Sequence, residues 1–248
     1  MIAVLLSAGK GTRMYPLTAN TPKCLIDIGR GKTILERQLD VLQECGITKV
    51  YIVAGYRIEQ VQAKINGHNL NGMEVEVLHN PFYETSNNII SLWLATLVIH
   101  EPFISINGDD IFTSSLIKNL LNSTGDIVMT IDRKEEYDAD DMMIITTKNK
   151  VIEVSKEVDR DLANGESVGI IKYSILGQKI LRDTVDVMLQ SQDNHQFFYL
   201  IVLQKIMDSG VPVNFCEVSQ DEWAEIDFHP DVTEVRNRVD HFMQKIQL

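Results

Sequence analysis

Apolar and polar residues follow one another along the chain in two rhythms. Short apolar runs such as IAVLL and KVYIVAG are typical of buried strands, whereas stretches with apolar residues every three or four positions are typical of amphipathic helices. In the first half of the chain the two kinds alternate. Strands are expected at residues 2–6, 49–55, 73–80 and 102–107, with helices at 33–46, 57–67 and 86–100.

The helix at 33–46 has the clearest ends. Thr33 and Glu36 are spaced as a capping box, and Gly46 follows the last turn. The alternation predicts an α/β fold, with a mixed, mostly parallel sheet sandwiched by helices. Ligands of such sheets bind beyond the carboxyl ends of the strands, which selects the loops at 7–23, 55–56 and 107–110.

The second half of the chain is richer in strands. No repeat or linker interrupts it, so a single domain spanning residues 1–248 is expected, with its two halves meeting near residue 110. Strands are expected at 126–131, 142–147, 151–155, 168–176, 211–218 and 223–227, with helices at about 177–190, about 196–209 and from about 230.

Composition excludes several classes of protein. The net charge of −12 argues against a nucleic-acid surface. Three cysteines without a C-x-x-C pair argue against a disulfide framework or a zinc site. The opening apolar run is too short for a signal peptide, and no stretch reaches about 18 apolar residues, so a cytoplasmic protein without membrane contact is expected.

Charge is unevenly spread along the chain. Residues 1–37 carry six basic side chains against two acidic ones, hence +4, while the rest of the chain carries −16. A small basic island in an acidic protein indicates a local anion site, although solvated lysines and arginines would give the same count.

The segment LLSAGKGTRMYPLTANTPK, residues 5–23, lies within this island and follows an apolar strand. It fits neither the P-loop pattern nor the dinucleotide fingerprint, in which Met14 would have to be glycine. Its glycines let backbone N–H groups approach an anion, and Lys10, Arg13 and Lys23 add positive charge. The alternative is an ordinary surface loop with incidental charges.

The longer stretch LSAGKGTRMYPLTANTPKCLIDI resembles the opening signature of nucleotidyltransferases that join a nucleoside triphosphate to a sugar phosphate or phosphocholine. The resemblance implies a glycosyltransferase-A-like (Rossmann-like) fold, with residues 1–110 binding nucleotide and 111–248 binding the acceptor. It also implies that Arg13 and Lys23 contact the phosphates. The expected nucleotide-binding residues are Leu6, Ala8, Gly9, Lys10, Gly11, Thr12, Gly55, Tyr56, Ser86, Asn87 and Asn88.

Nucleotidyl transfer brings two anions together, so a metal ion is expected, and Mg²⁺ prefers carboxylate and phosphate oxygens. Asp109 ends an apolar strand and resembles the first Asp of the family's metal motif. Glu225 and Asp227 alternate along a strand, so both carboxylates can face one cation. Alternative roles are a turn or N-cap for Asp109 and solvated charges for the other two.

Lys156, in the segment VIEVSKEVD, resembles the family lysine that neutralises the acceptor phosphate, and it completes a catalytic set with Arg13 and Lys23. Sugar-phosphate members usually have Glu-Lys-Pro there, whereas this chain has Ser-Lys-Glu, which weakens a sugar acceptor. A plain surface lysine is the alternative.

Two further stretches bear on the substrates. NPFYETSNNIISLWLA resembles the phosphocholine and phosphonate cytidylyltransferase branch, and the amides of Asn87 and Asn88 could contact a cytosine or simply cap a helix. Acidic groups and aromatic faces suit a cationic amine, unless the acidic cluster is only a solvated loop. That cluster is Asp138, Asp140 and Asp141, the available aromatics are Tyr137, Tyr173, Phe198 and Trp223, and the expected acceptor-binding residues are Asp138, Asp141, Gly169 and Tyr173.

The sequence therefore predicts a Mg²⁺-dependent cytidylyltransferase that transfers CMP from CTP to phosphocholine, 2-aminoethylphosphonate or a related small acceptor and releases pyrophosphate. A sugar-1-phosphate nucleotidyltransferase is the alternative, and a non-catalytic nucleotide-binding module is the third reading. The oligomeric state, a homodimer included, stays open.

Overall fold

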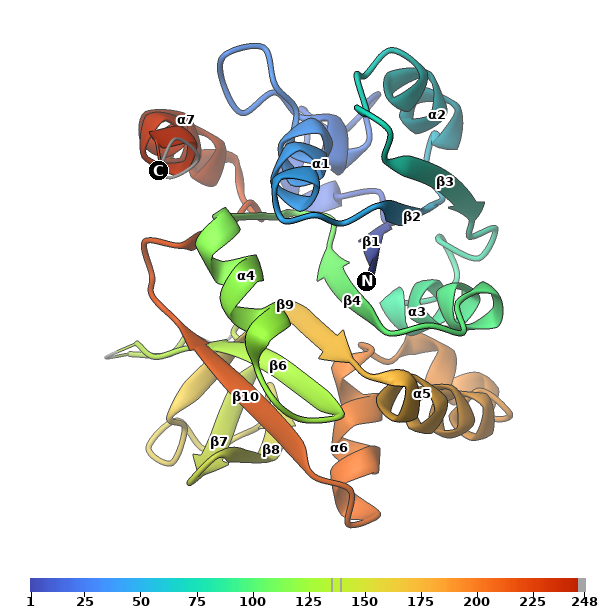
Figure 1. Ribbon diagram of the computed structural model, residues 1–248, viewed down its shortest axis with the longest axis vertical. Coiled ribbons are helices and arrows are strands. Elements are labelled where there is room, and N and C mark those ends of the chain that lie inside the picture. Colours follow the sequence, from blue (N-terminus) through green and yellow to red (C-terminus); the bar gives the residue numbers. More distant parts are fainter. Residues whose placement is uncertain (135, 139, 245–248) are drawn as a thin grey trace.

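A computed structural model describes residues 1–134, 136–138 and 140–244. Within these residues one nine-stranded mixed sheet runs through both halves of the chain, in the order β3-β2-β1-β4-β9-β6-β10-β8-β7 (Figure 1). The mixed sheet predicted from the sequence is confirmed. The division into a nucleotide half and an acceptor half stays a prediction.

The first half forms the parallel part of the sheet, because its strands are linked by helical crossovers. β1 pairs in parallel with both β2 and β4, and β2 pairs in parallel with β3. The strands are β1 (Ile2–Ser7), β2 (Lys49–Ala54), β3 (Glu74–His79) and β4 (Phe103–Asn107), and the helices are α1 (Ile34–Glu44), α2 (Ile58–Asn66) and α3 (Asn88–Val98).

In the second half β9 reverses the strand direction, since it lies antiparallel between β4 and β6. β10 is parallel to β6 and antiparallel to β8. β7 pairs antiparallel with β8 and also with β9. The strands are β6 (Ile127–Asp132), β7 (Met143–Thr147), β8 (Lys150–Ser155), β9 (Gly165–Tyr173) and β10 (Val213–Val218), and the helices are α4 (Ser114–Asn122), α5 (Ile175–Met188), α6 (Leu200–Asp208) and α7 (His229–Gln244).

The predicted capping box is present. The Thr33 hydroxyl accepts from the Glu36 N–H, and the Glu36 carboxylate accepts from the Thr33 N–H at 2.9 Å. Gly46 ends the helix with φ of 77°, a left-handed conformation that favours glycine. The sequence prediction missed α4, the short strand β5 (Asp110–Phe112) and three 3₁₀ turns, at Thr12–Met14, Lys23–Leu25 and Gln192–Gln196.

A second, two-stranded sheet connects distant parts of the sequence. β11 (Trp223–Glu225) pairs antiparallel with β5, and Glu225 lies opposite Asp110. The Ile226 N–H then donates to the Asp109 carbonyl at 3.1 Å. This pairing brings the acidic segment at 225–227 to the end of β4, more than 100 positions earlier in the chain.

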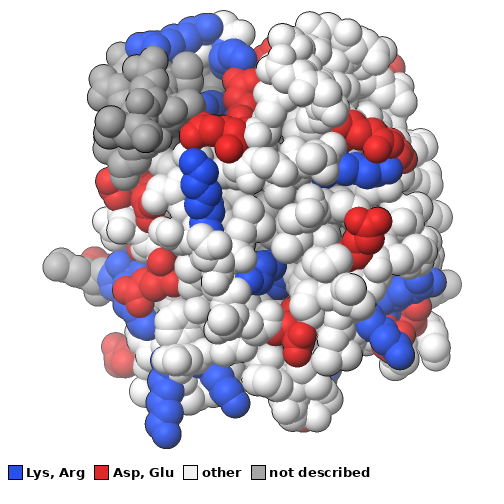
Figure 2. All heavy atoms as spheres, viewed as in Figure 1, with Lys and Arg blue, Asp and Glu red and all other residues white. Residues whose placement is uncertain are grey.

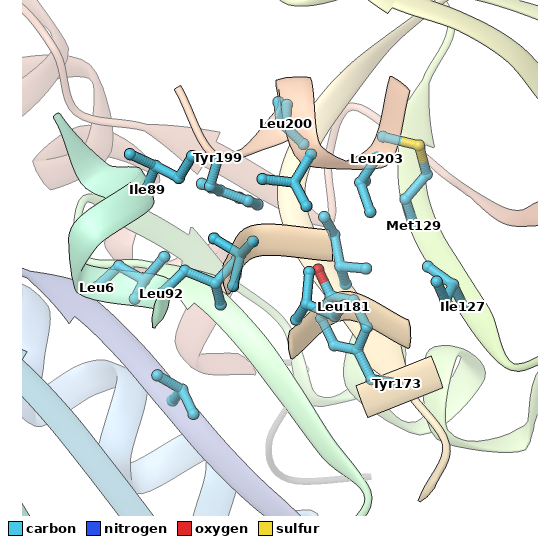
Figure 3. Packing of buried hydrophobic residues seen from close by; sticks show 14 of the residues in the cluster. Leu6, Ile89, Leu92, Ile127, Met129, Tyr173, Leu181, Tyr199, Leu200 and Leu203 are labelled. Carbon is cyan, nitrogen blue, oxygen red and sulfur yellow. The ribbon is translucent and has the colours of Figure 1, made fainter. Parts of the chain in front are cut away.

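Apolar side chains cover both faces of the large sheet, because alternate residues of each strand point to opposite sides. Leu6 and its face pack against α3, α5 and α6, whereas Leu5 and the other face pack against α1, α2 and α4. Figure 3 shows part of the first cluster. A third cluster packs Met14 of the first loop against Ile226 and Val232, which fixes that loop to the segment after β11.

Tyr173 belongs to this core and is a correction to the sequence prediction. The side chain is fully buried within this cluster (Figure 3). Its ring stacks on Phe103 with 4.8 Å between centroids. It does not line the cavity described below. We therefore withdraw Tyr173 from the acceptor-binding residues, because β9 runs antiparallel to β4 and places Tyr173 opposite Phe103 at the start of β4, away from the carboxyl end where the cavity opens.

On the face shown in Figure 2, acidic and basic side chains are interspersed. None of the helices in the described part of the chain is long and apolar enough to cross a membrane.

Candidate active site

A cavity of about 830 Å³ opens beyond the carboxyl ends of β1 and β4, where the sheet topology places ligands. Both halves of the chain line it. The sequence-predicted site residues that border it are Leu6, Gly9, Gly11, Arg13, Lys23, Asn87, Asn88, Asp109, Asp138, Asp141, Lys156, Gly169, Glu225 and Asp227.

The first loop is held in a compact shape. Gly11 has φ of 60°, and a Cβ there would lie 3.1 Å from Lys23 Cβ, so glycine keeps the two ends of the loop close. The Thr18 hydroxyl donates to the Gly11 carbonyl at 2.6 Å. Met14, fully buried, anchors the middle of the loop. The backbone facing the cavity is therefore ordered before any ligand arrives.

Basic side chains of this loop meet carboxylates in the cavity. The Lys23 ammonium donates to Asp109 Oδ2 at 2.7 Å and to Asp227 Oδ1 at 2.9 Å. Arg13 forms an ion pair with the other oxygen of Asp227. Burial by itself lowers the pKa of Lys23, but the charges of Asp109 and Asp227 outweigh it and raise the pKa above its ordinary value. Lys23 is therefore charged at any physiological pH.

Three carboxylates form a group that could hold a metal ion. One oxygen from each of Asp109, Glu225 and Asp227 lies within 4.8 Å of the others. Glu225 is an exposed residue, yet desolvation by the protein atoms around its carboxyl raises its pKa to about 7, and the charges of Asp109 and Asp227 act in the same direction. Clustered oxygen ligands that repel one another suit a hard divalent cation such as Mg²⁺. The residues present thus fit the ion that the sequence predicts.

Buried neighbours hold this carboxylate group in place. The Gln38 side-chain amide of α1 donates to the carbonyls of Asn107 and Asp110, at 2.9 and 2.8 Å, on either side of Asp109. At Gly169, with φ of 81°, a Cβ would lie 2.0 Å from the Asn107 amide nitrogen. Gly169 thus makes room for the loop that carries Asp109 and does not offer a side chain to a ligand.

The end of the cavity lined by Asp138, Asp140, Asp141 and Glu166 is acidic; Lys156 lines it, and Lys134 lies beside it. Lys156 lies 4.0 Å from Asp140, and its ammonium faces the Phe198 ring at 5.1 Å from the centroid. Lys134 forms ion pairs with Asp141 at 3.1 Å and with Glu166 at 2.6 Å. Both lysines therefore already have carboxylate partners in the free protein.

Other predicted nucleotide-binding residues lie beside the cavity rather than on it. The Ala8 carbonyl accepts from the Tyr56 N–H at 3.0 Å, and the Tyr56 hydroxyl donates to the Ala19 carbonyl at 2.6 Å. Lys10 pairs with Glu84 at 2.5 Å. The predicted residues that do not line the cavity are Ala8, Lys10, Thr12, Gly55, Tyr56, Ser86 and Tyr173.

The two asparagines lie at the start of α3, where Asn87 is the N-cap and accepts from the Asn88 N–H at 2.7 Å. The Asn88 side-chain oxygen accepts from the Tyr199 N–H at 2.8 Å. Sequence reasoning missed Gln38, Lys134, Glu166 and Phe228. Nothing local marks Glu166, which stands two positions before the strand expected at 168–176, because its burial depends on residues far away in the sequence.

Comparison with known proteins supports a specific family. A model of the MobA-like NTP transferase domain matches residues 3–198. The CTP:phosphoglutamine cytidylyltransferase of Campylobacter jejuni is 20% identical over 94% of this chain and 98% of its own length. The choline-phosphate cytidylyltransferase of Streptococcus pneumoniae is 32% identical over 48% of this chain and 49% of its own. A bifunctional GlmU protein of Methanococcus aeolicus is 28% identical over 70% of this chain and 40% of its own.

Solved structures share the fold. The inositol-1-phosphate CTP transferase from T. maritima has a TM-score of 0.81 at 22% identity, covering 99% of this chain and 96% of that one. The CTP:phosphocholine cytidylyltransferase from Streptococcus pneumoniae has a TM-score of 0.79 at 21% identity, covering 96% and 99%. The glycosyltransferase-A-like fold predicted from the sequence is thereby confirmed. Since the family model matches well over half of the chain, the protein belongs to the MobA-like NTP transferase domain family and is a nucleotidyltransferase.

Proposed function

We propose that the protein transfers CMP from CTP to a small acceptor that carries a phosphate or phosphonate and a cationic amine. The observation that carries the proposal is that Lys23, at the end of the loop that contains Gly9 and Gly11, forms ion pairs with Asp109 and Asp227. It joins a phosphate-binding cation and carboxylates suited to a metal ion in one cavity. The acidic end of the cavity, where an acceptor would bind, then favours a positively charged group on that acceptor. This end is lined by Asp138, Asp140, Asp141 and Glu166.

The reaction replaces one P–O bond at the α-phosphorus of CTP with another. An oxygen of the acceptor phosphate or phosphonate attacks the α-phosphorus of CTP, and a new P–O bond forms. The bond from that phosphorus to the oxygen bridging to the β-phosphate breaks, and pyrophosphate leaves with the electron pair. Little covalent work falls to the protein, so its contribution is positioning and charge neutralisation.

Arg13 and Lys23 serve the triphosphate in this proposal. Both now neutralise carboxylates, and bound phosphates would compete for the same cations. Mg²⁺, held by Asp109, Glu225 and Asp227, would supply positive charge for the phosphate oxygens. Lys156 would neutralise the attacking acceptor phosphate, and the amides of Asn87 and Asn88 would contact the cytosine edge. The ordered backbone at Gly9 and Gly11 would receive the phosphates.

A sugar-1-phosphate acceptor is the second candidate function. Its support is the similarity to bifunctional GlmU proteins over about 70% of the chain. Against it stand the Ser-Lys-Glu sequence around Lys156 and an acceptor end dense in carboxylates. A non-catalytic binding module has less support, since the cation and carboxylate set is assembled in the cavity.

Pyrophosphate release tests the proposal. The protein is assayed with Mg²⁺ and each of the four nucleoside triphosphates in turn, with phosphocholine, 2-aminoethylphosphonate or glucose-1-phosphate as acceptor. Release that requires both CTP and an amine-bearing acceptor supports the proposal. Release only with glucose-1-phosphate as acceptor, whichever of the four nucleotides supports it, would replace it with the sugar-phosphate function.

A further inference from the structure

The acceptor end of the cavity contains a buried carboxylate that the chemistry above does not use. Glu166, in β9, lines the cavity and is 3% exposed. Its Oε2 pairs with the Lys134 ammonium at 2.6 Å, whereas its Oε1 has no hydrogen-bond partner. A buried carboxylate oxygen without a donor is energetically costly, so a donor supplied by a ligand would gain most at this atom.

Acidic groups outnumber basic ones around Glu166. Lys134 serves both Glu166 and Asp141, so one cation is shared by two carboxylates. Asp132 lies opposite Glu166 in the pairing of β6 with β9, and the phenol of Tyr137 is also near enough to interact with it. Burial raises the pKa of Glu166 to about 8, Lys134 opposes the shift, and Asp141 adds to it. In the free protein this carboxyl therefore largely keeps its proton at neutral pH, and an ammonium group of a ligand beside it would favour the ionised form.

The phenyl rings of the cavity already face cations of the protein. Phe198 lies under the Lys156 ammonium, and Phe228 lies 5.6 Å from the Arg13 guanidinium carbon. The indole of Trp223 offers one further ring. Quaternary ammonium groups are bound by cages of several aromatic faces, because they have no N–H to donate. The surroundings of Glu166 instead match an ammonium that does have N–H donors.

We propose, resting on the transfer function above, that the acceptor carries an ammonium group with at least one N–H and that Glu166 accepts a hydrogen bond from it. Phosphoethanolamine and 2-aminoethylphosphonate belong to this class, and phosphocholine does not. A trimethylammonium head would leave Glu166 Oε1 without a donor. The site therefore favours acceptors whose ammonium group has an N–H to donate over acceptors with the same charge and no N–H.

A methylation series tests the proposal with the wild-type protein. Initial rates with CTP and Mg²⁺ are compared for phosphoethanolamine and its N-methyl, N,N-dimethyl and N,N,N-trimethyl forms, the last being phosphocholine. The loss of the last N–H is expected to lower kcat/KM at least ~10-fold, the factor that one charge-assisted hydrogen bond supplies. In Glu166→Gln the rate with phosphoethanolamine falls and the series becomes flat, while Glu153→Gln on the exposed face of β8 keeps the wild-type pattern.

The outcomes separate this inference from the function on which it rests. A kcat/KM for phosphocholine equal to or above that for phosphoethanolamine overturns the inference and leaves amine-directed cytidylyl transfer intact. Turnover with glucose-1-phosphate and none with any member of the series overturns the function itself. Thermal unfolding of Glu166→Gln reports whether the variant folds. If it does not fold, the methylation series with the wild-type protein still tests the inference.

Discussion

At the scale of single residues, the largest effects on turnover are expected where side chains neutralise the charge of the phosphates. Lys23→Ala and Asp109→Ala should each lower turnover at least ~10²-fold, because Lys23 supplies positive charge where negative charge develops in the transition state, and Asp109 is a proposed ligand of the metal ion that would do the same. Pyrophosphate release under saturating substrates measures the effect. Lys32→Ala is the matched control, since Lys32 is a basic residue of the same segment that pairs with Asp40 outside the cavity. Near-wild-type turnover of Lys23→Ala would contradict the assignment.

The raised pKa of Glu166 predicts a pH effect on stability. Its pKa rises from an ordinary 4.5 to about 8 on folding, chiefly through burial. Between these values the folded protein holds a proton that the unfolded chain has lost, so this group's contribution to stability falls as the pH rises from about 4.5 to about 8. Glu166→Gln should remove that part of the decline. Denaturant unfolding at pH 5 and pH 8 measures it, and an unchanged difference between the two pH values would contradict the burial argument.

Site residues differed in how far the sequence could reveal them. Asp109, Glu225 and Asp227 stand at strand ends or alternate along a strand, which are local patterns. Glu166 and Gln38 carry no local mark, because a polar residue at a strand start or on a helix looks solvated until its neighbours are known. Tyr173 was misassigned although its strand was predicted, because local sequence does not show which end of that strand borders the cavity.

At the scale of elements, Gly169 lets β9 pack closely against the loop at 107–110 that carries Asp109. Gly169→Ala should destabilise the protein by at least ~2 kcal/mol, because it strains a left-handed residue and drives a methyl group into Asn107. Gly31→Ala, at φ of 71° with open space around it, isolates the strain alone and should cost only about 1 kcal/mol. Thermal unfolding compares the two variants, and equal losses would remove the argument for close packing at Gly169.

Elements with a strong period were predictable, whereas short ones were not. α1 and its capping box follow from side-chain spacing within one segment. β5 has three residues and forms only because β11 pairs with it, so no local pattern announces it. α4 is rich in Ser and Asn, which are poor helix formers, and its helix depends on the Thr113 cap and on packing under the sheet.

At the scale of the whole molecule, the site depends on both halves of the chain. β9 from the second half inserts next to β4 from the first, and β11 returns to β5. These long-range pairings place Asp109 beside Glu225 and Asp227, and the order of strands that achieves this could not be deduced from local periodicity. The expectation that Asp109 lies near Glu225 and Asp227 came from the family resemblance and not from the pattern of residues.

Metal binding should therefore stabilise the assembled fold. With CTP present, Mg²⁺ is expected to raise the melting temperature, because a ligand that binds only the native state stabilises it. Excess chelator should abolish both the shift and turnover, and added Mg²⁺ should restore them. Glu225→Ala should lose most of the Mg²⁺-dependent shift. A shift of the same size in that variant would remove Glu225 from the proposed ligands.

The most direct test of the central claim is a competition in one reaction. The protein is incubated with Mg²⁺, equal amounts of CTP, UTP, ATP and GTP, and equal amounts of phosphoethanolamine and glucose-1-phosphate, and the products are identified by mass. The account predicts a single dominant product, the CMP conjugate of phosphoethanolamine, together with pyrophosphate. A nucleoside-diphosphate glucose as the main product would contradict it and make the protein a sugar-phosphate nucleotidyltransferase.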